Sequence, residues 1–187
     1  MISICLLCAG VASAQKSLLS QDEHNKYIYY EVVDAPGTTT DSLKKNADGF
    51  IANTYPKEKP LKSDNFSINI KDKFLTYSSL TKHETGEIAC ALTIECKDAK
   101  YRYWITDFVY TPYEKNRYGN FVPVTGIDLP LEKATTKISQ KDLDALLEQT
   151  GAFCKQTGEK LKKYMKEGDK VKKTDQQPVK KIVTDKW

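Results

Sequence analysis

Polar and apolar residues alternate along the middle of the chain, and this pattern predicts antiparallel strands. The first predicted strand, residues 27–33, is rich in aromatic and β-branched residues. Four more strands are expected at residues 65–70, 73–80, 86–97 and 100–110. The short polar segments Lys71-Asp72 and Asp98-Ala99 are expected to form hairpin turns between neighbouring strands.

Two other segments carry apolar residues at helical spacing. The first follows the hydroxyl side chains of residues 38–40, which are good N-caps, and its stripe comprises Leu43, Ala47, Phe50, Ile51 and Tyr55. The second follows Ser139, and its stripe comprises Leu143, Leu146, Leu147, Phe153, Cys154, Leu161 and Tyr164. This second helix is expected to dock on the sheet. Residues 111–137 are expected to be irregular, with one short edge strand at residues 120–124.

The register of the last predicted hairpin follows from its turn. With Asp98 and Ala99 as the two loop residues, the apolar face pairs Ile88 with Val109, Leu92 with Ile105, Ile94 with Tyr103 and Cys96 with Tyr101. The other face pairs Glu95 with Arg102 and Thr93 with Trp104. This register sets Asp107 on the inward face, opposite Cys90.

The first fourteen residues, MISICLLCAGVASA, have the apolar run and the small-residue ending of a secretion signal. We expect cleavage after Ala14 and export to the periplasm or the outside of the cell. No Lys or Arg precedes Lys16, so the basic start of such a signal is missing and a true start further upstream stays open. Neither Cys5 nor Cys8 follows a small residue, which disfavours a lipoprotein. The run is also shorter than the ~20 residues of a membrane span.

The rest of the chain divides by composition into a polar lead-in at residues 15–26, an α+β domain at residues 27–137, a helix at residues 138–166 and a disordered basic tail at residues 167–187. From Lys155 onward, eleven Lys face five Asp or Glu, so this surplus of six exceeds the whole chain's net charge of +4. The part before it is therefore net acidic, at −2. The tail serves either as a solubilising arm or as an electrostatic contact with anionic lipid or an acidic partner.

Candidate chemistry is sparse. Of the cysteines beyond the signal, Cys90 and Cys96 lie too far apart on one strand to bridge, so a disulfide would need Cys154, and buried free thiols are the alternative. His24 and His83 lie in polar surroundings and favour a surface role. No spacing indicates a metal or cofactor site, so we expect neither.

Two groups of residues have a functional alternative. An inward Asp107 either accepts hydrogen bonds from backbone amides or has a shifted pKa suited to a chemical role. In the second case, Asp107 and Tyr103 would form the centre of an enzymatic or small-ligand site. The aromatic residues Trp104, Phe108 and Tyr110 are the candidates for an exposed binding platform on the sheet.

The segments YIYYEVVDAPG and KDAKYRYWITDF, with the order of the elements between them, resemble a bacterial family of exported proteins described only as a domain of unknown function with a TBP-like fold. The resemblance covers about residues 27–110. It implies a curved antiparallel β-sheet with helices packed on one face, in the order β-α-β-β-β-β and then a C-terminal α-helix. It implies no activity and no catalytic residue.

Together these features favour a non-enzymatic exported domain that binds a protein or envelope component through an uncovered sheet face or an edge strand. The alternative is a small-ligand-binding or hydrolytic envelope enzyme with its site near Asp107 and Tyr103. Nucleic acid is not an expected partner, because the sheet-bearing part is net acidic and an exported protein meets little of it.

Overall fold

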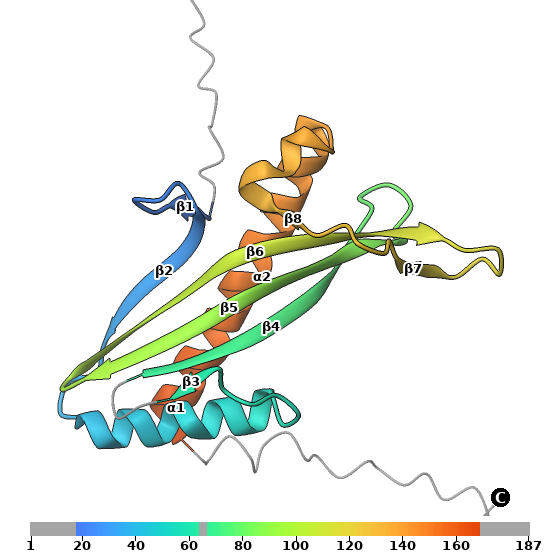
Figure 1. Cartoon of the computed structure of the whole chain (residues 1–187). Coiled ribbons are helices and arrows are strands. Elements are labelled where there is room, and N and C mark those ends of the chain that lie inside the picture. The colour runs from blue at the N-terminus through green and yellow to red at the C-terminus, as the bar shows by residue number, and fades with distance from the viewer. Residues whose placement is uncertain (1–17, 64–66, 169–187) are drawn as a thin grey trace, which may run out of the picture.

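An antiparallel sheet with two helices on one of its faces makes up residues 18–63 and 67–168, which the computed structural model describes (Figure 1). The elements are β1 (Ser20–Gln21), β2 (Tyr27–Asp34), α1 (Thr40–Thr54), β3 (Lys62–Ser63), β4 (Ser67–Tyr77), β5 (Glu84–Lys97), β6 (Lys100–Lys115), β7 (Phe121–Pro123), β8 (Leu129–Pro130), the 3-10 helix η1 (Leu131–Thr136) and α2 (Gln140–Glu167). The strand order is β1-β2-β6-β5-β4-β3, and β7 and β8 also pair with β6. The predicted α+β class is confirmed.

Both predicted helices form, and each begins at a hydroxyl cap. Thr39 accepts a hydrogen bond from the backbone N–H of Ser42 at the start of α1, and Ser139 accepts one from Asp142 at the start of α2. The turn between β5 and β6 adds a second contact for α1, because the Asp98 carboxylate accepts the backbone N–H of Thr40 at 2.8 Å. These contacts fix where each helix meets the sheet.

The core lies between the helices and one face of the sheet. On that face, alternate residues of β4, β5 and β6 are buried, and they include Ile68, Ile70, Ile88, Leu92, Ile94, Tyr103, Ile105 and Phe108. From the helices, Phe153 stacks on Phe74 of β4 with ring centroids 4.1 Å apart. No helix of residues 18–63 and 67–168 lies on the opposite face of the sheet (Figure 1).

One predicted turn does not exist. Lys71 and Asp72 lie in the middle of β4, which runs without a break from Ser67 to Tyr77, so one strand replaces two in the predicted order. The Asp72 carboxylate is satisfied inside the strand, since it accepts the Tyr55 hydroxyl at 2.6 Å and the backbone N–H of Lys73 at 2.8 Å. Such partners allow a polar pair to continue a strand instead of ending it.

The predicted hairpin register is correct near the turn and wrong beyond it. Glu95 pairs with Arg102 as expected, but the register shifts at Cys90, and Ile88 pairs with Tyr110 instead of Val109. The cause is a β-bulge at Asp107, whose φ of 55° lies in the left-handed region. Further pairs that the prediction had right are Leu92 with Ile105, Ile94 with Tyr103, Cys96 with Tyr101 and Thr93 with Trp104.

The bulge also places Asp107 and the residues that follow it on the face of the sheet opposite to the predicted one. Asp107 is exposed and not inward, while Phe108 and Tyr110, which we expected on the surface, are buried at 0% and 6% exposure. Trp104 alone of the three platform candidates keeps a partly exposed position. The predicted platform is therefore reduced to one aromatic ring.

The described part of the polar lead-in (residues 15–26) is more ordered than expected. Leu19 is buried, and β1 pairs Ser20 with Ile28 at the start of β2. The expected edge strand in residues 120–124 is confirmed as β7, although β6 extends to Lys115 and η1 adds a helical turn before α2. The expected signal peptide and almost all of the basic tail lie outside the described residues.

The thiols of Cys90, Cys96 and Cys154 are free and buried, so no disulfide joins them. Burial raises the pKa of the Cys154 thiol to about 12 and that of Cys96 to about 11. Thiols in this state are packing groups with little reactivity.

Candidate functional site

The two long edges of the sheet differ, and the β2 edge is the more open one. The backbone N–H of Ala35, just after β2, donates to the carbonyl of Ala99 at 2.8 Å and so points toward β6. In an antiparallel ladder the direction alternates along the strand. The backbone groups of Tyr30, Val32 and Asp34 therefore point away from β6.

The chain's own β1 covers only the first part of this edge. Ile28 pairs with Ser20 and Tyr27 with Gln21, and the residues that follow have no strand beside them within the described structure. In Figure 1, β2 forms the margin of the sheet below β1. We call residues 30–34 the open β2 edge.

Exposed apolar side chains lie along this edge on the uncovered face of the sheet. Tyr30 is 50% exposed and Val32 is 51% exposed. Next to them on β6, Arg102 donates to Glu95 through Nε at 2.8 Å and Nη2 at 2.6 Å, and its guanidinium carbon lies 5.5 Å from the centre of the Trp104 ring. Exposed apolar groups beside unpaired backbone groups are typical of a binding edge.

A polar contact on the covered face holds β2 in place. The Tyr103 hydroxyl donates to Glu31 at 2.5 Å, and the Lys162 ammonium of α2 donates to the other oxygen of the same carboxylate at 2.9 Å. Partial burial opposes ionisation of Glu31, but these two hydrogen bonds outweigh it and lower its pKa. The open edge therefore belongs to a strand that is anchored to both β6 and α2.

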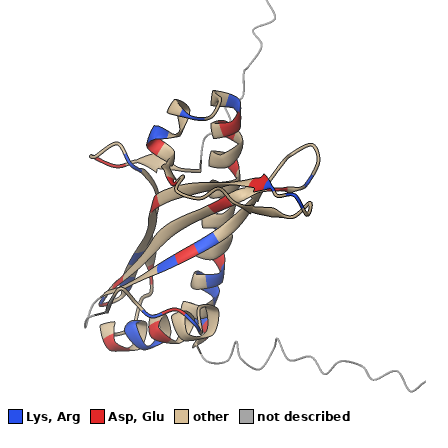
Figure 2. Cartoon of the chain, turned by 45° about the vertical axis from the view of Figure 1, so that its right-hand side comes forward, with Lys and Arg blue, Asp and Glu red and all other residues tan. Residues whose placement is uncertain are grey.

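The β4 edge is protected by several devices. β3 covers its beginning, and the exposed side chains of Lys71 and Lys73 follow, with basic and acidic positions side by side along the strand (Figure 2). At its end, the side-chain amide of Gln149 on α2 bonds both backbone groups of Tyr77: its oxygen accepts the N–H at 2.8 Å, and its nitrogen donates to the carbonyl at 3.1 Å. Lysines and covered backbone groups are common means of preventing strand addition.

A groove of about 410 Å³ lies where the end of α1 passes the middle of β4, and the pair Tyr55 and Asp72 lines it. Burial raises the pKa of Asp72, although the hydrogen bonds from Tyr55 and from the Lys73 backbone oppose this effect. Sequence reasoning missed this pair because its members are in different elements and Asp72 looked like a turn residue.

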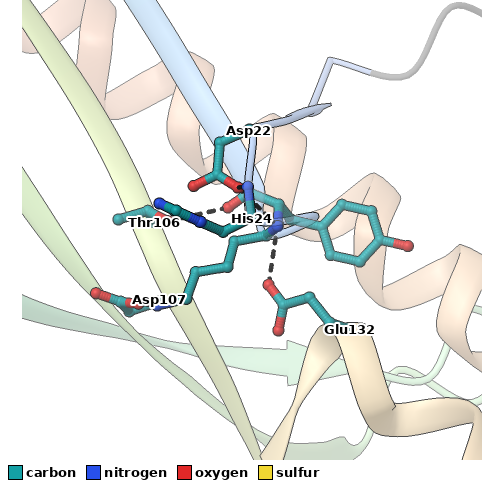
Figure 3. Close-up of polar contacts among 7 residues, drawn as sticks. Asp22, His24, Thr106, Asp107 and Glu132 are labelled. Carbon is teal, nitrogen blue, oxygen red and sulfur yellow. Dashed lines mark hydrogen bonds and ion pairs between the residues drawn. The ribbon is translucent and has the colours of Figure 1, made fainter.

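Asp107 is part of a different contact, which closes the upper end of β2 (Figure 3). Its carboxylate pairs with the Lys26 ammonium at 2.6 Å, and both side chains are about half exposed. Glu132 of η1 accepts the backbone N–H of Tyr27 at 2.9 Å. Figure 3 shows Glu132 directed toward the turn that carries Asp22 and His24, with Asp107 on the neighbouring strand. The carboxylates here hold the N-terminal turn to the bulge and to η1.

The structure does not bring Asp107 and Tyr103 together. Tyr103 is fully buried beneath α2, whereas Asp107 is exposed and four residues further along β6, at about 13 Å for an extended strand. Of the two histidines, His24 lies in the exposed turn and His83 is exposed and stacks on Phe121, with ring centroids 4.8 Å apart. In residues 18–63 and 67–168, His, Cys, Asp and Glu side chains form no group of three or more suited to a metal ion.

None of the helices in the described residues has the length and apolar character needed to cross a bilayer.

Comparisons with known proteins agree on the fold. Residues 29–111 match the model of the family described as Domain of unknown function (DUF4468) with TBP-like fold. A crystal structure of a TBP-like protein from Parabacteroides distasonis is similar at a TM-score of 0.61 and 16% identity, covering 75% of this chain and 93% of that one. A DUF4468 family protein from Bacteroides ovatus is similar at 0.60 and 12%, covering 80% and 91%. No curated protein matches the chain in sequence.

The family match covers β2 to β6 with the helix between them, which is the part that carries the open β2 edge and the bulge. The strand–helix–meander of residues 29–111 thus matches the DUF4468 family of unknown function, and together with the terminal helix it has a TBP-like fold.

Proposed function

We propose that this protein is an exported, non-enzymatic binding module that accepts an extended segment of a partner protein along the open β2 edge. The observation that carries the proposal is the contrast between the two edges of the sheet. The β4 edge is covered by β3, lysines and Gln149, whereas Tyr30 and Val32 present exposed apolar side chains beside unpaired backbone groups.

Strand addition at this edge has a clear physical basis. The backbone groups of Tyr30, Val32 and Asp34 can each pair with an added strand, which supplies affinity without any special side chain. The Glu31 contact with Tyr103 and Lys162 holds β2 in its extended form, so little ordering is needed on binding. Tyr30 and Val32 would pack against alternate side chains of the partner.

No catalytic group is required by this function. The separation of Asp107 from Tyr103 removes the support for an enzymatic site built on these two residues. Export is proposed from the N-terminal sequence, and its test is the mass of the protein recovered from the envelope or the medium. A chain that begins at Gln15 supports export, and a chain that retains residues 1–14 in the cytoplasm contradicts it.

The binding edge can be tested with a photo-cross-linking amino acid in living cells. We expect a cross-linker at Tyr30, on the open edge, to give a discrete adduct, and one at Tyr77, on the protected edge, to give none. A second variant, Val32→Pro, removes an outward N–H and leaves the β2–β6 ladder intact, because Val32 points away from β6. It should abolish the adduct at position 30.

The matched control is Lys71→Pro, which makes the same change on β4. Asn69 there accepts the N–H of Leu61, so Lys71 also points to its own outer edge. Circular dichroism must show both proline variants folded. Adducts of equal yield at positions 30 and 77, or adducts that persist in Val32→Pro and disappear in Lys71→Pro, would contradict the proposal.

A further inference from the structure

A pocket of about 170 Å³ adjoins the open β2 edge on the uncovered face. Its lining comprises Tyr30, Val32, Glu95, Lys97, Lys100, Tyr101 and Arg102. The register explains how these residues meet, because Val32 pairs with Arg102 and Arg102 pairs with Glu95 across three adjacent strands. A side chain that projects onto this face from a strand added beside Val32 would point over that row.

The charges of the pocket are not balanced. Arg102 and Glu95 neutralise each other at 2.6 Å. Lys97 and Lys100 flank the β5–β6 turn, and ion pairs in the described residues involve neither ammonium group. Asp34 lies opposite Lys100 in the register but is not part of the pocket lining. Two cations therefore stand at the rim of a pocket whose remaining lining is aromatic and aliphatic.

From this combination we infer that the segment bound at the β2 edge carries an aspartate or glutamate between apolar residues at alternate positions, with the acidic side chain in this pocket. The inference rests on the proposed function and adds the chemistry of the partner. A carboxylate there would pair with Lys97 or Lys100, while its apolar neighbours would cover Tyr30 and Val32. A lysine at the same position would be repelled by both cations.

The probes for the test are three labelled peptides that alternate valine and threonine and differ only at one central valine position, replaced by glutamate, glutamine or lysine, so that valines stay on the same face on either side of it. Their affinity is measured for the full protein, for the double variant Lys97→Glu/Lys100→Glu and for Lys71→Glu/Lys133→Glu. The last variant has the same net charge as the first double variant, but its changes lie on β4 and η1, outside the pocket.

We expect the natural protein to bind the glutamate peptide about tenfold more tightly than the lysine peptide, a difference of about 1.4 kcal/mol, because the glutamate gains an exposed ion pair and the lysine is repelled. The preference should shrink at high salt. It should disappear or reverse in the pocket variant and persist in the charge-matched control. This pattern supports the inference.

The experiment distinguishes failure of this inference from failure of the proposed function. Peptides that bind with equal affinity whatever the central residue, or a preference lost equally in both double variants, overturn the inference and leave strand addition standing. If no peptide binds, and sedimentation shows a dimer that Val32→Pro dissociates, the occupant of the edge is a second copy of the chain, and both the inference and the proposed partner are wrong. If no peptide binds and the protein is a monomer, both are wrong as well.

Discussion

Gly158 of α2 faces the hydroxyl end of Tyr103 so closely that a Cβ added to the glycine would overlap the Tyr103 oxygen. Tyr103 cannot easily turn aside, because it is fully buried and its hydroxyl is bonded to Glu31. The glycine in the middle of a long helix is therefore a contact residue, and it sets how near α2 lies to the sheet behind the open β2 edge.

Replacing Gly158 with alanine should destabilise the protein, although alanine is the better helix former. The gain in helix propensity is up to ~1 kcal/mol, and overpacking of a core costs about 1–3 kcal/mol. We expect a lower melting temperature, by about 2–4 °C for each kcal/mol lost. The exposed substitution Gln156→Ala on the same helix should not lower it.

The double variant Gly158→Ala/Tyr103→Phe separates the contact from general helix effects. Without the hydroxyl, the closest remaining atom is the ring carbon at 3.0 Å. The double variant should lose less stability than the sum of the two single variants. Additive losses would mean that the two residues do not meet in solution.

The bulge at Asp107 can be tested without reference to its ion pair. Asp107→Ala and Asp107→Gly both remove the carboxylate that Lys26 contacts, but only glycine adopts a φ of 55° without steric strain. The glycine variant should be more stable than the alanine variant by about 1 kcal/mol in urea unfolding. If alanine is equal or better, the left-handed backbone at this position is wrong.

Asp72 should give the protein an unusual dependence on pH. Its pKa is raised by burial in the folded state, so the folded protein binds the proton more tightly than the unfolded chain does. The stabilisation that this proton provides is full below the ordinary value of 3.8 and is lost as the pH rises through the higher folded pKa.

The measurement compares the natural protein with Asp72→Asn. The natural protein should gain unfolding free energy relative to this variant as the pH is lowered from about 7 to about 4. Asp41→Asn, which removes an exposed carboxylate in the first turn of α1, is the matched control variant. A relative loss in acid would mean that Asp72 is stabilised as the anion.

Gln149→Ala should open the end of the β4 edge. The variant leaves both backbone groups of Tyr77 without their side-chain partner, and we expect a loss of about 1 kcal/mol in unfolding free energy and faster aggregation on heating. Gln140→Ala is the matched control, because its amide bonds only Asp144 within the same helix. Equal behaviour of the two variants would contradict the protective role.

The sequence predicted those parts of the fold that depend on local pattern. The register next to Asp98-Ala99 was correct because the turn fixes the pairing and the alternation of apolar residues excludes a slip. It failed beyond Asp107 because a bulge moves every later residue to the other face, and the only local signal was a polar residue among inward apolar ones.

Other parts depend on contacts between distant residues. Asp72 stays in a strand because Tyr55 supplies a hydroxyl from α1. An edge strand could be expected from the sequence, but which edge is open is decided by where β1 ends and by the reach of Gln149 from α2 to Tyr77. Neither is visible in the pattern of a single segment.

The unequal edges of the sheet also limit how many molecules can join it. A sheet that can grow on both sides can build a filament, since every added strand offers a new margin to the next copy. Here β3 and Gln149 cover the two ends of β4 and lysines lie between them, so under the proposed function strand addition is confined to the β2 margin. The proposed function therefore makes the protein a monovalent acceptor, and a complex formed at β2 should have one partner segment for each copy and a finite size.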